Sequence, residues 1–257
     1  MNSNLLYEKK EETFHIFFFD ELSTTQKIAE AFEKEDRESW TVVVAKTQTA
    51  GRGRYHNRDW FSPYGGLWFS VLIRPMINVD KLKGFSLLPS ISSAWAIRKL
   101  TDLNATIKWP NDIIVENKKI GGTVIESKIN MKKNIYSVIG IGINANFLQK
   151  AFPQHLSTKA TSILQQTGKE TQLDKLLVTI LQKMYRLYNA LIQGESFRLV
   201  EEYLNLSDTI GRKVRIFNNQ HQITGLAKCV GETGALILEL TDGSSKKVET
   251  CKHLIYL

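Results

Sequence analysis

The chain has 257 residues, of which 42% are hydrophobic and 23% are charged, and this composition excludes a disordered protein and predicts a sizeable buried core. Its formal net charge of +8 favours an acidic or polyanionic partner, such as a nucleotide, a nucleic acid or an acidic protein. The chain has two cysteines, no apolar signal sequence and no apolar run long enough to span a bilayer. These features predict a cytoplasmic protein without a disulfide framework or a membrane anchor.

The first half of the chain contains short apolar runs separated by polar segments. A strand is predicted at 15–19, followed by a helix that Ser23 or Thr24 caps. A second helix is predicted over 83–100, interrupted near Pro89. Runs rich in β-branched and apolar residues predict further strands at 41–45, 67–74, 106–108, 113–116, 123–127 and 135–144.

The second half of the chain contains one long helical pattern and then a group of short strands. Apolar residues recur at helical spacing from Leu173 to Leu191, which predicts one continuous amphipathic helix. After Gly211, turn residues separate evenly spaced short strands, a pattern typical of a small β-barrel. These strands are predicted at 213–217, 223–230, 235–240 and 246–248.

Strands and helices that do not alternate strictly predict the α+β class for the larger part of the chain. We therefore expect a polar N-terminal extension at 1–13, an α+β domain at 14–207 and a small β domain at 208–257.

A loop rich in glycine and arginine follows one of the predicted strands. Gly51 and Gly53 allow the backbone to approach a ligand closely. Arg52, Arg54 and Arg58 carry guanidinium groups, which match the oxygens of phosphates and carboxylates. The loop is therefore a candidate phosphate clamp. The alternative interpretations are an exposed basic loop and an RNA-binding tract.

The run KWPND at 108–112 and the lysine that follows it form a second group of polar residues. Asn111 and Asp112 come after a proline, at a turn position where side chains can face a pocket. Lys119 lies on the other arm of a hairpin predicted to turn at 116–118. The carboxylate of Asp112 can hold Mg²⁺, and Lys119 can neutralise an anion. A simple turn and a solvated hairpin tip are the alternatives.

The run GIGINA at 140–145 matches a dinucleotide-binding pattern, but its surroundings exclude that function. No acidic residue occurs between Ser127 and Lys169, so the carboxylate that would bind the ribose is missing. The two glycines instead predict that a ligand lies against this strand, with Asn144 as a polar contact at its end. No metalloprotease, nucleophile-elbow or Walker A motif occurs in the chain.

Taken together and in this order, the motifs resemble those of the biotin–protein ligases. The resemblance runs from about Phe14 to the C-terminus, and it implies a mixed central sheet with flanking helices followed by a small SH3-like β-barrel. The motifs that carry it are Ser23-Thr24, Gln48-x-x-Gly51-Arg52-Gly53-Arg54, Trp60-x-Ser62-Pro63, Leu67-x-x-Ser70, Lys108-Trp109-Pro110-Asn111-Asp112, Lys119-x-x-Gly122 and Gly140-x-Gly142-x-Asn144.

The resemblance implies an enzyme that makes biotinyl-5′-AMP from biotin and ATP with Mg²⁺. The enzyme then passes biotin to one lysine of the biotin carboxyl carrier protein of acetyl-CoA carboxylase. Lys119 and Arg54 are the implied catalytic residues, and Asp112 is the implied metal ligand. The implied biotin-binding residues are Ser23, Thr24, Thr25, Gln48, Gly51, Arg52, Lys119 and Gly122. The implied ATP-binding residues are Arg54, Arg58, Trp60, Asn111 and Asn144.

The sequence departs from the family pattern at three places. Thr25 stands where the family often has asparagine, and Gly121 stands where alanine or cysteine is common. The segment 55–58 is one residue longer than the usual arginine-glycine-arginine run. Residues 1–13 are too few for the winged-helix repressor domain of some members, so we expect the ligase-only form, as a homodimer without a specific DNA partner. A lipoate–protein ligase is the nearest alternative. A basic nucleic-acid-binding module is the alternative from another class, because the stretch 128–169 contains lysines and no acidic residue.

Overall fold

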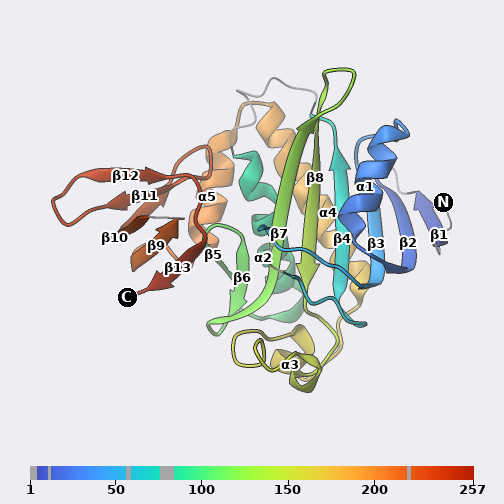
Figure 1. Cartoon of the computed structure of the whole chain (residues 1–257), viewed down its shortest axis with the longest axis horizontal. Helices are drawn as coiled ribbons and strands as arrows, with labels where there is room; N and C mark the ends of the chain where they lie inside the picture. Colours follow the sequence, from blue (N-terminus) through green and yellow to red (C-terminus); the bar gives the residue numbers. More distant parts are fainter. Residues whose placement is uncertain (1–4, 11–12, 56–58, 76–83, 219–220) are drawn as a thin grey trace. The chain divides into compact units, whose positions relative to one another are not determined.

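The computed structural model describes residues 5–10, 13–55, 59–75, 84–218 and 221–257 (Figure 1). Its contacts divide the chain into two compact units. The first unit combines Met1–Met76 with Glu116–Leu177, and the second combines Ile77–Val115 with Val178–Leu257. The domain boundary at 207/208 that the sequence suggests stays a prediction.

The first unit is built on a mixed β-sheet. Its strands are β1 (Leu5–Lys10), β2 (His15–Leu22), β3 (Thr41–Gln48), β4 (Leu67–Ile73), β7 (Lys118–Ile129) and β8 (Ile135–Ile143). They lie in the order β1-β2-β3-β4-β8-β7. The strands β2 and β3 are parallel, and the other neighbouring pairs are antiparallel. Every residue of β4 is buried, as expected for a central strand.

Helix α1 (Thr25–Lys34) covers one face of this sheet. Thr24 is its N-cap, because the side-chain oxygen of Thr24 accepts a hydrogen bond from the backbone N–H of Gln26 at 3.3 Å. Ala29 and Phe32 are buried in a cluster with residues of β2, β3, β4 and β8 such as Val43. The predicted cap and the helical spacing of apolar residues are both confirmed. The unit also contains the short helices η3 (Gln149–Ala151) and α3 (Ile163–Thr167).

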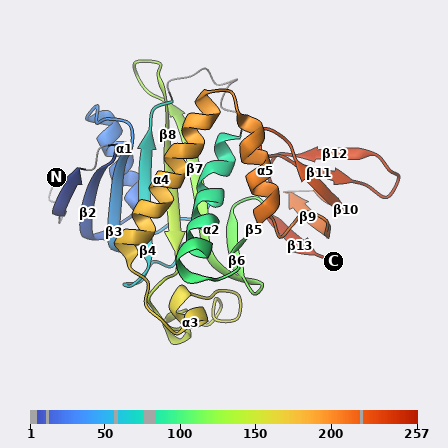
Figure 2. The ribbon, with the colours of Figure 1, turned by 180° about the vertical axis from the view of Figure 1, so that it is seen from behind.

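The second unit combines helices, a short hairpin and a separate antiparallel sheet. Its helices are η2 (Phe85–Leu87), α2 (Leu88–Thr101), α5 (Ser196–Leu206) and most of α4 (Leu173–Ile192), and Figure 2 shows the three longer ones. Its hairpin consists of β5 (Thr106–Lys108) and β6 (Asp112–Val115). Its sheet consists of β9 (Lys213–Asn218), β10 (His221–Val230), β11 (Leu236–Glu239), β12 (Ser245–Val248) and β13 (His253–Tyr256), in the order β12-β11-β10-β9-β13.

These elements confirm the predicted α+β class with a second, antiparallel sheet near the C-terminus. The apolar stripe that begins at Leu173 forms the buried face of α4. The predicted interruption near Pro89 is wrong, because this proline lies in the first turn of α2, where its missing N–H costs nothing. Strand β1 lies inside the predicted polar extension, and β13 follows the last strand that the sequence predicted.

Candidate functional site

The side chain of Gln48, at the end of β3, links the start of α1 to the loop that follows β3. Its Oε1 accepts a hydrogen bond from the backbone N–H of Thr25 at 2.9 Å and lies 3.2 Å from the Thr25 hydroxyl. Its Nε2 donates to the hydroxyl of Ser62 at 2.8 Å. The Thr25 hydroxyl also lies 2.8 Å from that of Ser70 on β4. One polar network therefore joins two predicted biotin-binding residues to two serines of the family motifs.

The residues just before α1 are joined to the same loop. The backbone N–H of Ala50 donates to the carbonyl oxygen of Ser23 at 2.9 Å. The side chain of Ser23 is exposed, whereas Thr24 is buried and caps the helix. Of these two predicted biotin-binding residues, Thr24 thus already has a structural task at the helix terminus.

The glycine- and arginine-rich loop folds back on itself. The backbone N–H of Trp60 donates to the carbonyl oxygen of Gly51 at 2.9 Å, and Arg52 and Asp59 form a β-bridge. A Cβ atom at Gly51 would lie 2.5 Å from the Trp60 carbonyl oxygen and 2.7 Å from the Ser62 hydroxyl oxygen. Glycine is therefore required at position 51 because neighbouring atoms approach its Cα so closely.

The arginines of this loop lie in different surroundings. Arg52 is exposed, and Arg54 is half-buried with its guanidinium carbon 5.9 Å from the ring centroid of Tyr55. Arg58, a predicted ATP-binding residue, lies outside the described residues. Its contact with ATP stays a prediction.

Two glycines that face each other across β7 and β8 leave room for the indole ring of Trp60. Gly122 and Gly142 are direct partners in this strand pair. A Cβ atom at Gly142 would lie 2.6 Å from Nε1 of Trp60, and one at Gly122 would lie 3.2 Å from its Cζ3. The ammonium nitrogen of Lys119 lies 4.8 Å from the centroid of the same ring, a cation–π distance. Predicted biotin-binding and ATP-binding residues therefore meet at Trp60.

Gln26 is a further residue of this site, and none of the sequence motifs includes it. A Cβ atom at Gly140 would lie 3.2 Å from Cδ of Gln26, so the side-chain amide rests on β8 beside the glycine pair. Its Nε2 is buried and, like Nε1 of Trp60, has no hydrogen-bond partner in the part of the chain that the structure describes. Gln26 follows the Ser-Thr-Thr run of the first family motif, which is the signal that could have pointed to it.

Asn144 lies at the end of β8, where its side chain holds neighbouring segments together. Its Nδ2 donates to the carbonyl oxygen of Thr161 at 2.9 Å and to that of Lys119 at 3.5 Å. The residue is 4% exposed. The amide therefore fixes the segment that carries Lys119, and its predicted contact with ATP stays a prediction.

The run at 108–112 belongs to the second unit, where it forms the β5–β6 hairpin. Asn111 and Asp112 are both half-buried there. The backbone N–H of Trp109 donates to the hydroxyl of Thr209 at 2.9 Å, and its indole N–H donates to the carbonyl oxygen of Gly234 at 3.0 Å. The hairpin is thus attached to two segments that border strands of the C-terminal sheet, one before β9 and one between β10 and β11.

An aromatic ring of the C-terminal sheet lies close to two cations of this unit. The Lys108 ammonium and the Arg212 guanidinium carbon lie 4.6 Å and 4.7 Å from the ring centroid of Tyr256. Burial raises the pKa of the Tyr256 hydroxyl well above its ordinary value, and this hydroxyl lies 3.2 Å from that of Thr209. Tyr256 therefore stays a neutral phenol over the physiological pH range.

In the described ranges, no three or more His, Cys, Asp or Glu side chains are arranged to hold a metal ion, so Asp112 stays a predicted ligand. None of the helices seen in those ranges is long and apolar enough to cross a bilayer.

Comparisons with known proteins place this chain among the protein ligases. The model of the biotin/lipoate A/B protein ligase family matches residues 18–144. The bifunctional ligase/repressor BirA of Bacillus subtilis is 34% identical over 237 residues, which are 90% of this chain and 71% of that protein. BirA of Escherichia coli is 27% identical over 202 residues, which are 78% of this chain and 62% of that protein.

A solved structure agrees with these sequence relatives. The biotin protein ligase from Aquifex aeolicus in complex with biotin and ATP superposes with a TM-score of 0.79 at 25% identity, covering 94% of this chain and 99% of that chain. The resemblance that the motifs indicated is thereby confirmed, and the chain belongs to the biotin/lipoate A/B protein ligase family.

Proposed function

We propose that this ligase activates biotin with ATP to form biotinyl-5′-AMP and then transfers biotin to a lysine of the biotin carboxyl carrier protein. One observation carries the choice of substrate. The ammonium of Lys119 lies against the indole of Trp60, which covers the glycine pair Gly122 and Gly142, and the polar network of Gln48 lies at the start of α1. This arrangement suits a slender apolar molecule with a carboxylate at one end and a polar ring at the other. Biotin has that form.

The first reaction joins the biotin carboxylate to the nucleotide. A carboxylate oxygen attacks the α-phosphorus of ATP, the bond from that phosphorus to the bridging oxygen breaks, and diphosphate leaves. The ammonium of Lys119 stabilises the negative charge that develops on the phosphoryl oxygens. Arg54 is proposed to hold the phosphate of the finished intermediate, because its guanidinium group offers several donors in one plane.

The second reaction transfers the activated acyl group. The amine nitrogen of the carrier lysine attacks the carbonyl carbon of biotin, the carbon–oxygen bond to the phosphate breaks, AMP leaves, and the amine loses a proton. No covalent intermediate with the enzyme is needed. The protein contributes mainly the positions of the reacting groups and the exclusion of water from the mixed anhydride.

Magnesium is expected to arrive with ATP as part of the substrate. Mg²⁺ in nucleotide sites is commonly held by substrate phosphates and by one or two carboxylates. The carboxylate of Asp112, half-buried on β6, fits that limited role. Mg²⁺ held in this way does not require a complete set of protein ligands.

The lipoate alternative differs at the ring end of the substrate. The five-membered disulfide ring of lipoate has no strong hydrogen-bonding group, whereas the ureido ring of biotin has two N–H donors and a carbonyl oxygen. Polar groups of Gln48, Thr25 and Ser70 gather at this end of the site. A dithiolane offers no strong donor or acceptor to this polar network, which disfavours it.

Calorimetric titration of the full chain with biotin and with lipoate tests the choice of substrate. We expect saturable binding of biotin, no measurable binding of lipoate, and release of diphosphate from Mg-ATP that depends on biotin. Release of diphosphate with lipoate but not with biotin would overturn the proposal in favour of a lipoate–protein ligase. A chain that responds to neither acid would remove the proposed activity altogether.

A further inference from the structure

Gln26 lies where α1 meets the sheet of the first unit. It belongs to the first turn of α1, and the side chain of Thr24 fixes its backbone N–H. Its side-chain amide rests over Gly140 of β8, where a Cβ atom would lie 3.2 Å from Cδ. Glycine at position 140 therefore lets the amide lie flat against the strand.

The neighbours of Gly140 connect this amide with the site. Gly140 is paired with Ser70 on β4, whose hydroxyl lies 2.8 Å from that of Thr25. Gly142 is two residues further along β8, so it faces the same side of the sheet as Gly140. Gly142 lies beneath the indole of Trp60. The amide of Gln26 and the indole therefore follow one another along one face of β8.

Both side chains have a buried donor that lacks an acceptor. Nε2 of Gln26 and Nε1 of Trp60 have no hydrogen-bond partner within the described residues. Buried donors in folded proteins are nearly always paired, because an unpaired one has lost its water without compensation. Two such donors over neighbouring glycines indicate that a ligand with acceptor atoms completes this site.

The order of the groups assigns an end of the ligand to each. Lys119 lies against Trp60, which covers the Gly122–Gly142 pair. Gln26, which follows Thr25 in the first turn of α1, lies over Gly140, two residues before Gly142 on β8. A biotin molecule whose carboxylate points to Lys119 has its ureido ring near Gln26. We propose that the side-chain amide of Gln26 donates a hydrogen bond to the ureido carbonyl oxygen and thereby helps to select biotin. This inference rests on the proposed function.

The test uses two substitutions at Gln26 and two ligands. Gln26→Leu keeps the size of the side chain and removes its donor, whereas Gln26→Glu replaces the donor with a carboxylate. The ligands are biotin and 2-iminobiotin, whose cyclic guanidinium presents an N–H donor where biotin has the carbonyl oxygen. Gln172→Leu makes the same chemical change at an exposed glutamine and is the matched control. Binding is measured by calorimetry on the full chain without ATP, at a pH where 2-iminobiotin is protonated.

We expect Gln26→Leu to lower the affinity for biotin by about tenfold, since one neutral hydrogen bond is lost. Gln26→Glu should weaken biotin further and strengthen protonated 2-iminobiotin, so that the preference between the two ligands moves toward the latter. A merely structural role would not produce that change of preference. Gln172→Leu should bind both ligands like the wild type.

The outcomes separate this inference from the function on which it rests. If the wild type binds biotin and Gln26→Leu binds it within twofold, or Gln26→Glu keeps the wild-type preference, Gln26 is not the donor and the proposed function stands. If the wild type itself does not bind biotin, the proposed function and the role of Gln26 are both overturned. Gln26→Glu decides the question by itself should Gln26→Leu fail to fold.

Discussion

The indole of Trp60 and the two glycines beneath it depend on one another for their positions. A side chain at Gly122 or Gly142, which are partners across β7 and β8, would displace the indole ring. A Cβ atom at Gly142, for example, would lie 2.6 Å from Nε1 of Trp60. Glycine at these positions therefore shapes the candidate site as directly as any polar residue does.

Gly142→Ala is expected to weaken biotin binding and to lower the free energy of unfolding by about 1–3 kcal/mol, the usual cost of forcing extra atoms into a packed site. Gly231→Ala is a matched control, because the nearest atom to a Cβ there, the carbonyl oxygen of Ala235, lies 3.9 Å away. Calorimetric titration and thermal unfolding measure the two effects. Wild-type affinity and stability in Gly142→Ala would show that the indole does not need this space.

Lys119 is expected to act on the transition state more than on the bound substrate. Its ammonium is a compact charge, and its attraction grows as negative charge develops on the phosphoryl oxygens. Lys119→Ala should therefore slow formation of biotinyl-5′-AMP by about 100-fold. Lys119→Arg should not restore the rate, because a planar guanidinium does not replace a point charge. Single-turnover measurements test this, and a full rate in either variant would contradict the assigned role.

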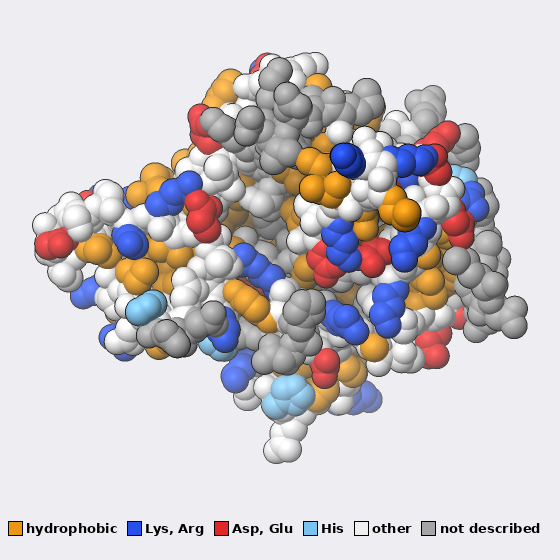
Figure 3. All heavy atoms as spheres, turned by 45° about the horizontal axis from the view of Figure 1, so that its top comes forward, with side chains coloured by type: hydrophobic (Ala, Val, Ile, Leu, Met, Phe, Trp, Pro, Cys, Tyr) orange, Lys and Arg blue, Asp and Glu red, His pale blue; other side chains and the backbone are white. Residues whose placement is uncertain are grey.

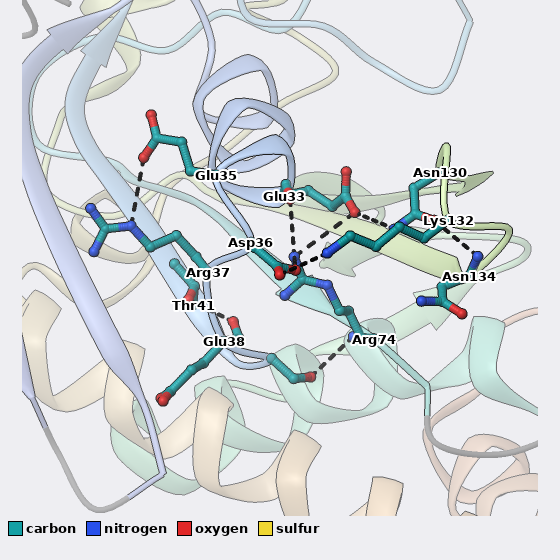
Figure 4. A network of polar contacts seen from close by, with 11 residues as sticks. Glu33, Glu35, Asp36, Arg37, Glu38, Thr41, Arg74, Asn130, Lys132 and Asn134 are labelled. Carbon is teal, nitrogen blue, oxygen red and sulfur yellow. Dashed lines mark hydrogen bonds and ion pairs between the residues drawn. The ribbon is translucent and has the colours of Figure 1, made fainter.

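At the scale of elements, the tip of the β7–β8 hairpin is tied to the end of α1 by the charged network in Figure 4. The amide of Asn130 donates to the carboxylate of Glu33 at 2.8 Å, and Lys132 donates to Asp36 at 2.9 Å. The guanidinium of Arg74 lies 3.8 Å from Glu33 and 3.7 Å from Asp36. The network holds α1, and with it the Thr24–Gln26 corner of the site, against the sheet.

This network predicts a pH dependence of stability. The hydrogen bond from Lys132, and then its charge, hold the pKa of the Asp36 carboxyl below its ordinary value of 3.8. A carboxyl whose pKa is lowered in the folded state stabilises that state above the pKa of the unfolded chain, and this contribution is lost as the pH falls through the folded-state pKa. Lys132→Ala should therefore lower the melting temperature slightly at neutral pH and not at all in strong acid.

Lys133→Ala is the matched control for this prediction. Lys133 lies on the same hairpin and has no ion pair with the described residues. Its removal should leave the melting temperature close to that of the wild type at every pH. A deficit in Lys132→Ala that persists unchanged in strong acid would show that the ion pair with Asp36 is not its cause.

The sequence predicted most elements, and the exceptions have identifiable causes. The apolar periodicity of α4 and the β-branched run of β3 were clear, because packing enforces those patterns. Strand β1 was missed because its sequence, LLYEKK, ends in charged residues, and β-pairing at a sheet edge tolerates such residues. Pro89 was misread because proline is compatible with the first turn of a helix as well as with a break.

The candidate site was predicted in part for a similar reason. Motifs marked Gln48, Lys119 and the glycines, whose chemistry or conformational freedom is unusual enough to be visible in a sequence. The contact between Gln26 and Gly140 joins residues far apart in the chain, so no local sequence pattern predicts it. Buried donors without acceptors become visible only when the surrounding side chains are placed.

For the whole molecule, the net charge of +8 is the feature that bears on its partners. On the face shown in Figure 3, Lys and Arg side chains lie among Asp and Glu side chains. Lys128 and Lys132, which lie in the stretch that suggested a nucleic-acid-binding module, pair with Glu30 and Asp36. This pairing favours a partner that is recognised by shape and moderate charge rather than a continuous polyanion.

The net charge is expected to act on the encounter with an acidic carrier domain. Charges that steer two proteins together are screened by salt, whereas charges inside a site are screened much less. Raising the ionic strength should therefore slow transfer to the carrier more than formation of biotinyl-5′-AMP. Stopped-flow measurements of the two steps test this. Equal slowing of both steps, or tight salt-sensitive binding of arbitrary DNA or RNA, would contradict it.

The predicted homodimer is also a property of the whole molecule, and light scattering with and without biotin and ATP tests it. We expect a dimer at least in the presence of both substrates. A monomer under both conditions would contradict that prediction and would leave the proposed chemistry untouched.

The proposed function ends with biotin attached to a carrier lysine. The most direct measurement is the mass of an isolated biotin carboxyl carrier domain after incubation with the full chain, biotin and Mg-ATP. We expect a gain of one biotinyl group on one lysine, no gain when ATP is omitted, and a strongly reduced initial rate with Lys119→Ala. An unchanged carrier mass, or a lipoyl group added when lipoate is supplied in place of biotin, would contradict it.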